Sequence, residues 1–90
     1  MKEIRWSKEK DARLKMNRGI GFEQVAEMIE RNEIIEVILH PNTVRYPNQG
    51  IYALLIGGYV YHVPCVETNI IFLKTIFPSR KATKHYLRDH

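Results

Sequence analysis

Residues 51–65 read IYALLIGGYVYHVPC, two runs rich in β-branched, aromatic and other apolar residues on either side of Gly57-Gly58. Residues of these types favour β-strands. A Gly-Gly pair between two such runs is typical of a two-residue hairpin turn. We therefore predict two antiparallel strands, Ile51–Ile56 and Tyr59–Cys65, as the centre of the fold.

The segments on either side of this hairpin predict two more strands. Ile34–His40 is an apolar-rich run before the hairpin, and Ile70–Phe77 is another one after it. Between the first strand and the hairpin, Pro41–Gln49 contains two prolines and two asparagines, which indicates a loop. The sheet is thus expected to have four antiparallel strands.

Three helices complete the expected fold. Ser7 can cap a helix over residues 8–17, which Gly19 ends. Phe22–Arg31 carries one apolar stripe, and Ser79 can cap a last helix over Arg80–Arg88. The predicted fold class is α+β, with two N-terminal helices packed on one face of the sheet and a C-terminal helix.

Hairpin register predicts which residues share a sheet face. The turn pairs Ile56 with Tyr59 and Leu54 with Tyr61, and a short turn after Cys65 would pair Tyr61 with Lys74. One face then carries Ile51, Ala53, Leu55, Val60, His62, Ile71, Leu73 and Phe77, and the other carries Tyr52, Leu54, Tyr59, Tyr61, Lys74 and Ile76. We expect the first face to take the helices, with Ile35, Val37 and Leu39. The second face would be exposed, with Glu36 and His40.

Composition describes an ordinary globular chain of one domain, residues 1–90, with 44% hydrophobic and 27% charged residues. Cys65 is the single cysteine, so an internal disulfide is excluded and a reducing compartment fits best. The first six residues contain no apolar run, so we expect neither a signal peptide nor a location outside the cytoplasm.

Charge is distributed unevenly along the chain. The net charge is +4, and residues 1–69 balance nine basic against nine acidic residues. The excess of positive charge therefore lies in the last strand and the tail. This part of the chain contains one acidic residue, Asp89, and five basic residues: Lys74, Arg80, Lys81, Lys84 and Arg88. Such a patch is typical of proteins that bind phosphate groups or acidic partners, although a solvated basic tail gives the same pattern.

The last helix places Arg80 and Lys81 in its first turn, where cations are unfavourable because that end of a helix is positive. Backbone N–H groups at the same end suit an oxyanion. The two cations are therefore consistent with a bound phosphate. A helix that merely tolerates them in solvent is the alternative.

Several segments resemble the BrnT family of toxins. Trp6 with Lys8 and Lys10, the run Arg18-Gly19-Ile20-Gly21-Phe22-Glu23, and the ending Ser79-Arg80-Lys81-Ala82-Thr83 after an apolar strand are similar to segments of that family. The resemblance covers about residues 5–87. The loop from His40 to Gln49 differs from the acidic linker of better-known members.

This resemblance implies a RelE-like ribonuclease fold and a type II toxin–antitoxin system. It also implies an antitoxin partner, expected to be of the ribbon-helix-helix type, and RNA cleavage in the cytoplasm without a metal or another cofactor. Contact with DNA would then be indirect, through the antitoxin.

Cleavage of this kind uses the 2′-hydroxyl of RNA as the nucleophile. Arg80 is the predicted phosphate ligand because its guanidinium suits bidentate contact. Lys74 would neutralise charge or move a proton, His40 would act as acid or base, and Tyr61 would stack on a base or position water. The RNA-binding residues would be Tyr59, Arg45, Lys81, Lys84 and Arg88. His62 is predicted to be structural, while His85 and Tyr86 on the last helix are possible contributors that the pattern does not orient.

Other functions stay open on sequence alone. No His/Cys cluster with zinc-ligand spacing and no paired acidic motif is present, which argues against a metal-dependent nuclease. A non-catalytic RNA-binding module with the same basic patch would have a similar sequence. So would a protein-interaction domain whose basic tail binds an acidic partner.

Overall fold

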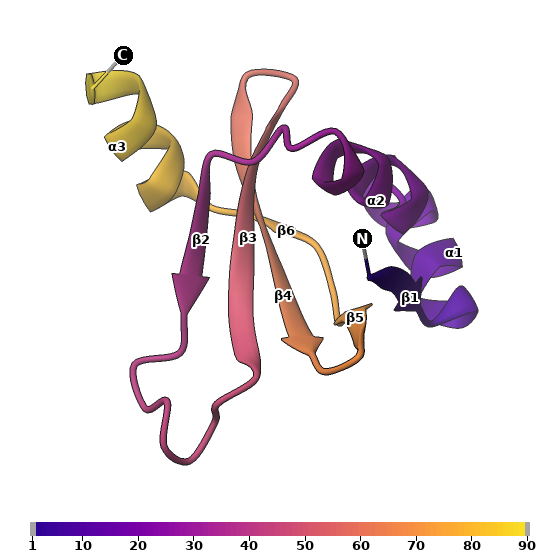
Figure 1. Ribbon diagram of the computed structural model, residues 1–90. Helices are drawn as coiled ribbons and strands as arrows, with labels where there is room; N and C mark the ends of the chain where they lie inside the picture. Colours follow the sequence, from indigo (N-terminus) through magenta and orange to yellow (C-terminus); the bar gives the residue numbers. More distant parts are fainter. Residues whose placement is uncertain (1, 90) are drawn as a thin grey trace.

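The computed structural model describes residues 2–89, with side chains to residue 88, and Figure 1 shows its order of elements. The described chain forms, in order, β1 (Glu3–Trp6), α1 (Lys8–Arg18), α2 (Phe22–Glu30), β2 (Glu36–Leu39), β3 (Gln49–Ile56), β4 (Tyr59–Glu67), β5 (Ile70–Leu73), β6 (Phe77–Pro78) and α3 (Arg80–Asp89). None of its helices is long and apolar enough to cross a membrane.

The sheet is mixed and has six strands in the described chain. Its order is β1-β5-β4-β3-β2, and β6 also pairs with β4. The α+β class is confirmed, but the predicted sheet of four antiparallel strands is wrong. A strand precedes the two N-terminal helices and runs parallel to β5. The predicted strand Ile70–Phe77 is broken into β5 and β6.

The β3–β4 hairpin forms as expected from Gly57-Gly58. Both glycines have positive φ, 59° and 79°, which is the conformation that a type I′ turn requires. Ile56 pairs with Tyr59 and Leu54 with Tyr61, as predicted.

The junction between α1 and α2 explains the Arg18–Glu23 run. Gly19 ends α1 in the left-handed conformation, with φ 72°. The Asp11 carboxylate, on α1, accepts a hydrogen bond of 2.8 Å from the Phe22 N–H at the start of α2. A Cβ at Gly21 would collide with the side chains of Asp11 and Lys15, so a glycine is needed at this close approach.

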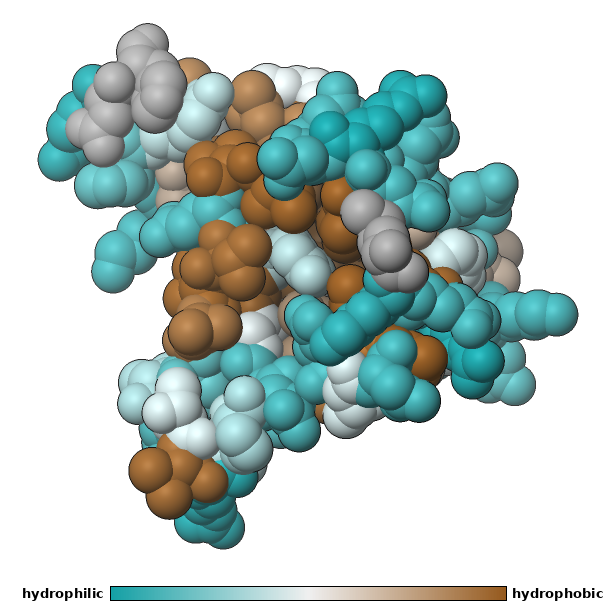
Figure 2. All heavy atoms as spheres, in the orientation of Figure 1, coloured by the Kyte–Doolittle hydropathy of each residue, from teal (hydrophilic) through white to brown (hydrophobic). Residues whose placement is uncertain are grey.

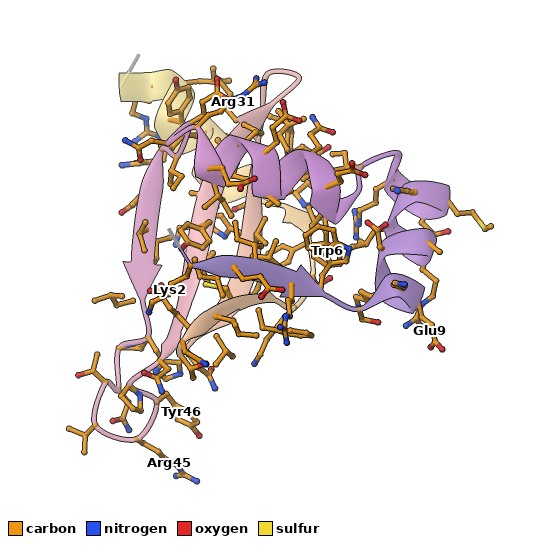
Figure 3. All side chains as sticks on the ribbon, turned by 45° about the vertical axis from the view of Figure 1, so that its right-hand side comes forward. Lys2, Trp6, Glu9, Arg31, Arg45 and Tyr46 are labelled. Atoms are coloured by element: carbon orange, nitrogen blue, oxygen red, sulfur yellow. The ribbon has the colours of Figure 1, made fainter. Side chains whose placement is uncertain are left out.

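The main core lies between these two helices and the sheet. The predicted stripe of α2, Phe22, Val25, Ala26 and Ile29, is buried. The rings of Trp6 and Phe22 stack with centroids 6.0 Å apart, and Figure 3 shows Trp6 at the end of β1, next to α2. The core cluster also contains Leu14, Ile20, Tyr52, Leu54, Val63, Cys65, Ile71, Leu73 and Ile76.

The predicted assignment of the central sheet faces is reversed. Tyr52 and Leu54, expected on the exposed face, are buried in the core under α1 and α2. Ala53 and Val60, expected under those helices, are buried on the other face, beside α3. Figure 1 shows α1 and α2 on one side of the sheet and α3 on the other. Both faces of the hairpin are apolar because both are covered, so alternation could not decide between them.

The edge strand β2 also departs from the prediction. Val37 pairs with Tyr52, so the face of Val37 and Leu39 is the one opposite Ile51 and Ala53. No helix covers this face at β2, and Val37 and Leu39 are therefore 51% and 66% exposed. Figure 2 shows apolar side chains gathered over β2 and β3, between α3 and the loop that follows β2.

The register of β5 moves Lys74 away from Tyr61. Cys65 pairs with Leu73, and the Lys74 N–H donates to the Pro64 carbonyl at 2.8 Å. The expected Lys74–Tyr61 pair is therefore wrong by three residues. Because an odd shift inverts the face, Lys74 and Tyr61 lie on opposite faces of the sheet.

Helix α3 is fastened to β4 through the backbone of Val60. The Val60 carbonyl accepts from the Ser79 N–H at 2.9 Å, and the Val60 N–H donates to the buried Thr83 Oγ1 at 2.9 Å. The Thr83 hydroxyl donates to the Ser79 carbonyl at 2.7 Å. Ser79 Oγ accepts from the Ala82 N–H at 3.1 Å, which confirms Ser79 as the cap.

Replacing Thr83 tests this docking. Thr83→Val keeps the shape of the side chain but leaves the buried Val60 N–H without its acceptor. We expect a loss of about 1–3 kcal/mol in the free energy of unfolding, measured by urea denaturation. Thr83→Ser, which keeps the hydroxyl, should lose clearly less. A small loss for Thr83→Val together with a larger loss for Thr83→Ser would show that the methyl group, and not the hydrogen bond, holds α3 in place.

Candidate functional site

A hollow lies between α3 and the sheet. It has a volume of about 520 Å³, and we call it the α3 groove. Residues from β2, β3 and β4 form its floor, and α3 forms its wall. Its lining comprises Ile35, Glu36, Ile38, Ala53, Val60, His62, Ser79, Lys81, Ala82, Lys84, His85, Tyr86 and Arg88.

Three cations line the α3 groove from the helix side. Lys81, Lys84 and Arg88 follow one another at i, i+3 and i+7, which places them on the same face of α3. Glu36 is the one acidic side chain among the described residues of the lining. All three predicted RNA-binding residues of the last helix thus lie in one hollow. Arg80, the predicted phosphate ligand, is exposed at the start of α3 and is not part of the lining.

Two histidines complete the polar lining. His62 projects from β4 and His85 from α3, so they approach the groove from its floor and its wall. The His62 ring is half-buried and meets the Phe77 ring edge-on, with centroids 5.8 Å apart. His62 was predicted to be structural because it was assigned to the sheet face of the two N-terminal helices, whereas His85 was a possible contributor whose orientation the sequence left open. The spacing of His85 one residue after Lys84 was the only signal for the second.

His40 and Lys74 line a separate, smaller hollow of about 190 Å³. Their predicted proximity on one sheet face therefore agrees with the structure. The His40 Nδ1 accepts a hydrogen bond from the Asn42 N–H at 3.0 Å, which leaves Nε2 as the protonated nitrogen of a neutral ring. The ring also packs against Tyr46, with centroids 4.4 Å apart.

The predicted tyrosines lie on the opposite side of the sheet. Tyr61 is half-buried against the core cluster, and Tyr59 contacts it edge-on with centroids 6.0 Å apart. Neither lines the α3 groove or the hollow of His40 and Lys74. The structure therefore does not bring the four predicted catalytic residues, Lys74, Arg80, His40 and Tyr61, into one site.

Arg45 lies in the loop between β2 and β3. Its guanidinium carbon sits 5.5 Å from the centre of the Tyr46 ring, a cation–π contact. Figure 3 shows both residues near the tip of that loop, away from the helices. Arg45 could therefore meet only a ligand long enough to reach beyond the α3 groove.

The described residues contain no group of three or more His, Cys, Asp or Glu side chains arranged to hold a metal ion. The polar side chains that line the α3 groove carry three cations, two imidazoles, one phenol, one aliphatic hydroxyl and one carboxylate.

Cys65 is buried in the core and is also among the lining residues of the hollow of His40 and Lys74. Burial, with a smaller contribution from Glu67, raises the pKa of its thiol from 9.0 to about 11. At neutral pH the thiolate, which is the nucleophilic form, is therefore suppressed roughly 100-fold relative to an ordinary cysteine.

Thiol labelling and pH-dependent unfolding test this environment. Native protein at pH 8 should react with an aromatic disulfide reagent far more slowly than protein in urea. Because the thiol pKa is higher in the folded state, ionisation favours the unfolded state, and stability should fall as pH rises from 9 to about 11. Cys65→Ala should show a flatter profile over this range. Rapid native labelling would place Cys65 at an accessible site instead.

Comparison with models of protein families, with curated protein sequences and with solved structures yields no match. None of these comparisons identifies the BrnT family, so the resemblance to its toxins stays a hypothesis. The α3 groove is interpreted from its own residues.

Proposed function

We propose that this protein binds RNA in the α3 groove and cleaves it without a metal ion, as the toxin of a type II toxin–antitoxin system. The observation that carries the proposal is the gathering of Lys81, Lys84 and Arg88 with His62 and His85 around one hollow. Cations that neutralise a phosphate and imidazoles that transfer protons are the groups such a cleavage needs.

The three cations would hold the RNA backbone. Lys84 and Arg88 lie one turn apart on α3, and Lys81 precedes them by another turn. Side chains spaced in this way can contact neighbouring phosphates, or one phosphate during the reaction. Arg80, at the first position of α3, lies close in sequence to these cations, and its role as a phosphate ligand stays a prediction. The carboxylate of Glu36 lies across the groove and would repel a phosphate from that side.

The two histidines supply an acid–base pair. One neutral imidazole would take the proton of the 2′-hydroxyl, whose oxygen then attacks phosphorus. The other, protonated, would donate a proton to the departing 5′-oxygen. The products are a 2′,3′-cyclic phosphate and a free 5′-hydroxyl. Imidazole suits both roles because its ordinary pKa is near neutrality.

The toxin assignment rests on the resemblance to BrnT proteins, and the α+β fold with a basic C-terminal helix is compatible with the RelE-like architecture that the resemblance implies. An antitoxin of the ribbon-helix-helix type would inhibit the protein by covering the cationic groove. An acidic inhibitor segment fits that surface because opposite charges favour docking and exclude RNA.

Incubation of the purified protein with RNA in EDTA tests the catalytic proposal. We expect cleavage that leaves 2′,3′-cyclic phosphate ends, and none of DNA, which lacks the 2′-hydroxyl. His62→Gln and His85→Gln should each lower the cleavage rate about 10²–10⁴-fold while RNA binding is retained. The product ends are identified by mass spectrometry.

His40→Gln is the matched control, because His40 lines a different hollow. If this variant loses cleavage completely while the other two keep normal rates, the hollow of His40 and Lys74, and not the α3 groove, is the catalytic site. Intact RNA that binds with a strong salt dependence would support the non-catalytic RNA-binding module. No binding at all would support the protein-interaction domain.

Inducible expression tests the biological role. The wild-type protein should arrest growth and reduce bulk RNA integrity, and expression of the cognate antitoxin should relieve both. Lys84→Gln with Arg88→Gln should remove toxicity without unfolding the protein, because both side chains are exposed. Full toxicity of this double variant would contradict the groove as the RNA site.

A further inference from the structure

A second basic hollow lies on the N-terminal side of the molecule, between α1 and the segment that joins β5 to β6. It has a volume of about 440 Å³, and we call it the α1 hollow. Its lining comprises Lys10, Arg13, Leu14, Asn17, Arg18, Thr75, Ile76 and Phe77. Leu14 and Ile76 are buried and form its base, while the polar side chains surround them.

Lys10, Arg13 and Arg18, the cations of the α1 hollow, lack the carboxylate partners that some other cations of the described chain have. Lys15, Arg31 and Lys2 each form an ion pair with a carboxylate, at 3.1, 2.6 and 2.8 Å. Within the described residues, no carboxylate lies within 4.0 Å of the basic groups of Lys10, Arg13 or Arg18, and none lines the hollow.

This arrangement is unfavourable for α1 on its own. Lys10 and Arg13 are three residues apart on the helix, where like charges repel. Lys10 also lies in the first turn, where cations oppose the helix dipole. Asp11, which could offset these charges, is already used by Lys15 and by the Phe22 N–H. A bound anion would relieve the repulsion.

Phe77 connects this hollow to the α3 groove. Phe77 lines the α1 hollow and is 36% exposed, and its ring contacts the ring of His62, which lines the groove. An exposed aromatic ring between two basic hollows is the arrangement that holds single-stranded nucleic acid, in which unpaired bases stack on aromatic rings and phosphates meet cations. A paired base in a duplex cannot stack in this way.

We propose that the α1 hollow is a second phosphate site, which binds the backbone of single-stranded RNA after the strand leaves the α3 groove across Phe77. This inference rests on the proposed function of the groove and assigns the substrate class: an unpaired RNA strand long enough to span both hollows. Arg13 and Arg18 bind its phosphates, Asn17 and Thr75 offer hydrogen bonds, and the Phe77 ring stacks on a base.

Fluorescence anisotropy with labelled RNA tests the second site. The RNA carries 2′-O-methyl groups, which block cleavage, and is used as a trinucleotide and a decanucleotide. For the decanucleotide, Arg13→Gln with Arg18→Gln should weaken binding about tenfold and lower the slope of log affinity against log salt by about 1.4, two phosphate contacts of a single strand. Trinucleotide binding should change little, because it needs only the α3 groove.

Three variants make the result specific. Lys8→Gln with Arg31→Gln removes two charges outside the hollow and should leave the salt slope for the decanucleotide nearly unchanged. Arg13→Lys with Arg18→Lys should restore most of the affinity. Phe77→Leu keeps an apolar side chain but removes the stacking surface, and should weaken decanucleotide binding about fivefold.

The outcomes separate this inference from the proposed function. If Lys84→Gln with Arg88→Gln weakens binding but the Arg13 and Arg18 variant does not, the second site is wrong and the groove stands. If the hollow variant alone has an effect, the α3 groove is wrong as the RNA site, and with it the path proposed here. If the hollow variant weakens binding of inorganic pyrophosphate but not of the decanucleotide, the hollow binds small phosphates, which overturns the RNA path.

Discussion

Val60 joins the two halves of this structure through its backbone. In a two-residue hairpin its N–H and carbonyl point away from β3, and both are bonded to the segment that begins α3, by Thr83 Oγ1 and by the Ser79 N–H. Ser79 also caps α3, so one short segment starts the helix and fastens it to the sheet. The direction of α3, and therefore the position of every cation on it, follows from this contact.

The consequence is a sheet covered on both faces over its central strands. On one face, α1 and α2 cover Tyr52 and Leu54, while on the other face Ala53 and Val60 are buried beside α3. Because α3 is short and basic, it does not seal its face, and the space that remains is the α3 groove. The groove thus arises from a helix that is held at its first turn and leaves open space along the rest of its length.

Charge is used in two different ways on this surface. Lys2, Lys15 and Arg31 are paired with carboxylates, so their charges are balanced within the protein. The cations of the α3 groove and of the α1 hollow have no carboxylate within ion-pair distance among the described side chains. His62 lines the groove and Phe77 lines the hollow, so their ring contact is the midpoint of the phosphate-binding surface that we propose.

Local sequence determined the elements that depend on neighbouring residues. Gly57-Gly58 specified a turn with two positive φ angles, the stripe from Phe22 to Ile29 specified the buried side of α2, and Ser7 and Ser79 specified helix starts. Helical spacing alone also accounts for the shared face of Lys81, Lys84 and Arg88, although Arg80, the predicted phosphate ligand, lies outside the groove lining. The strand Glu3–Trp6 was not predicted, because the strand with which it pairs lies more than sixty residues away in the sequence.

Only the tertiary structure decided which layer covered each face and where the strands aligned. Tyr52 and Ala53 are adjacent and both buried, so hydrophobic alternation carried no information about the face that meets α1 and α2. The pairing of Cys65 with Leu73, which separates Lys74 from Tyr61, depends on long-range packing of β5 between β1 and β4. A sheet has a side-chain period of two, so an odd shift in register inverts every face assignment that follows it. For that reason the basic helix was recognisable from the sequence, whereas the histidines that share its groove were not.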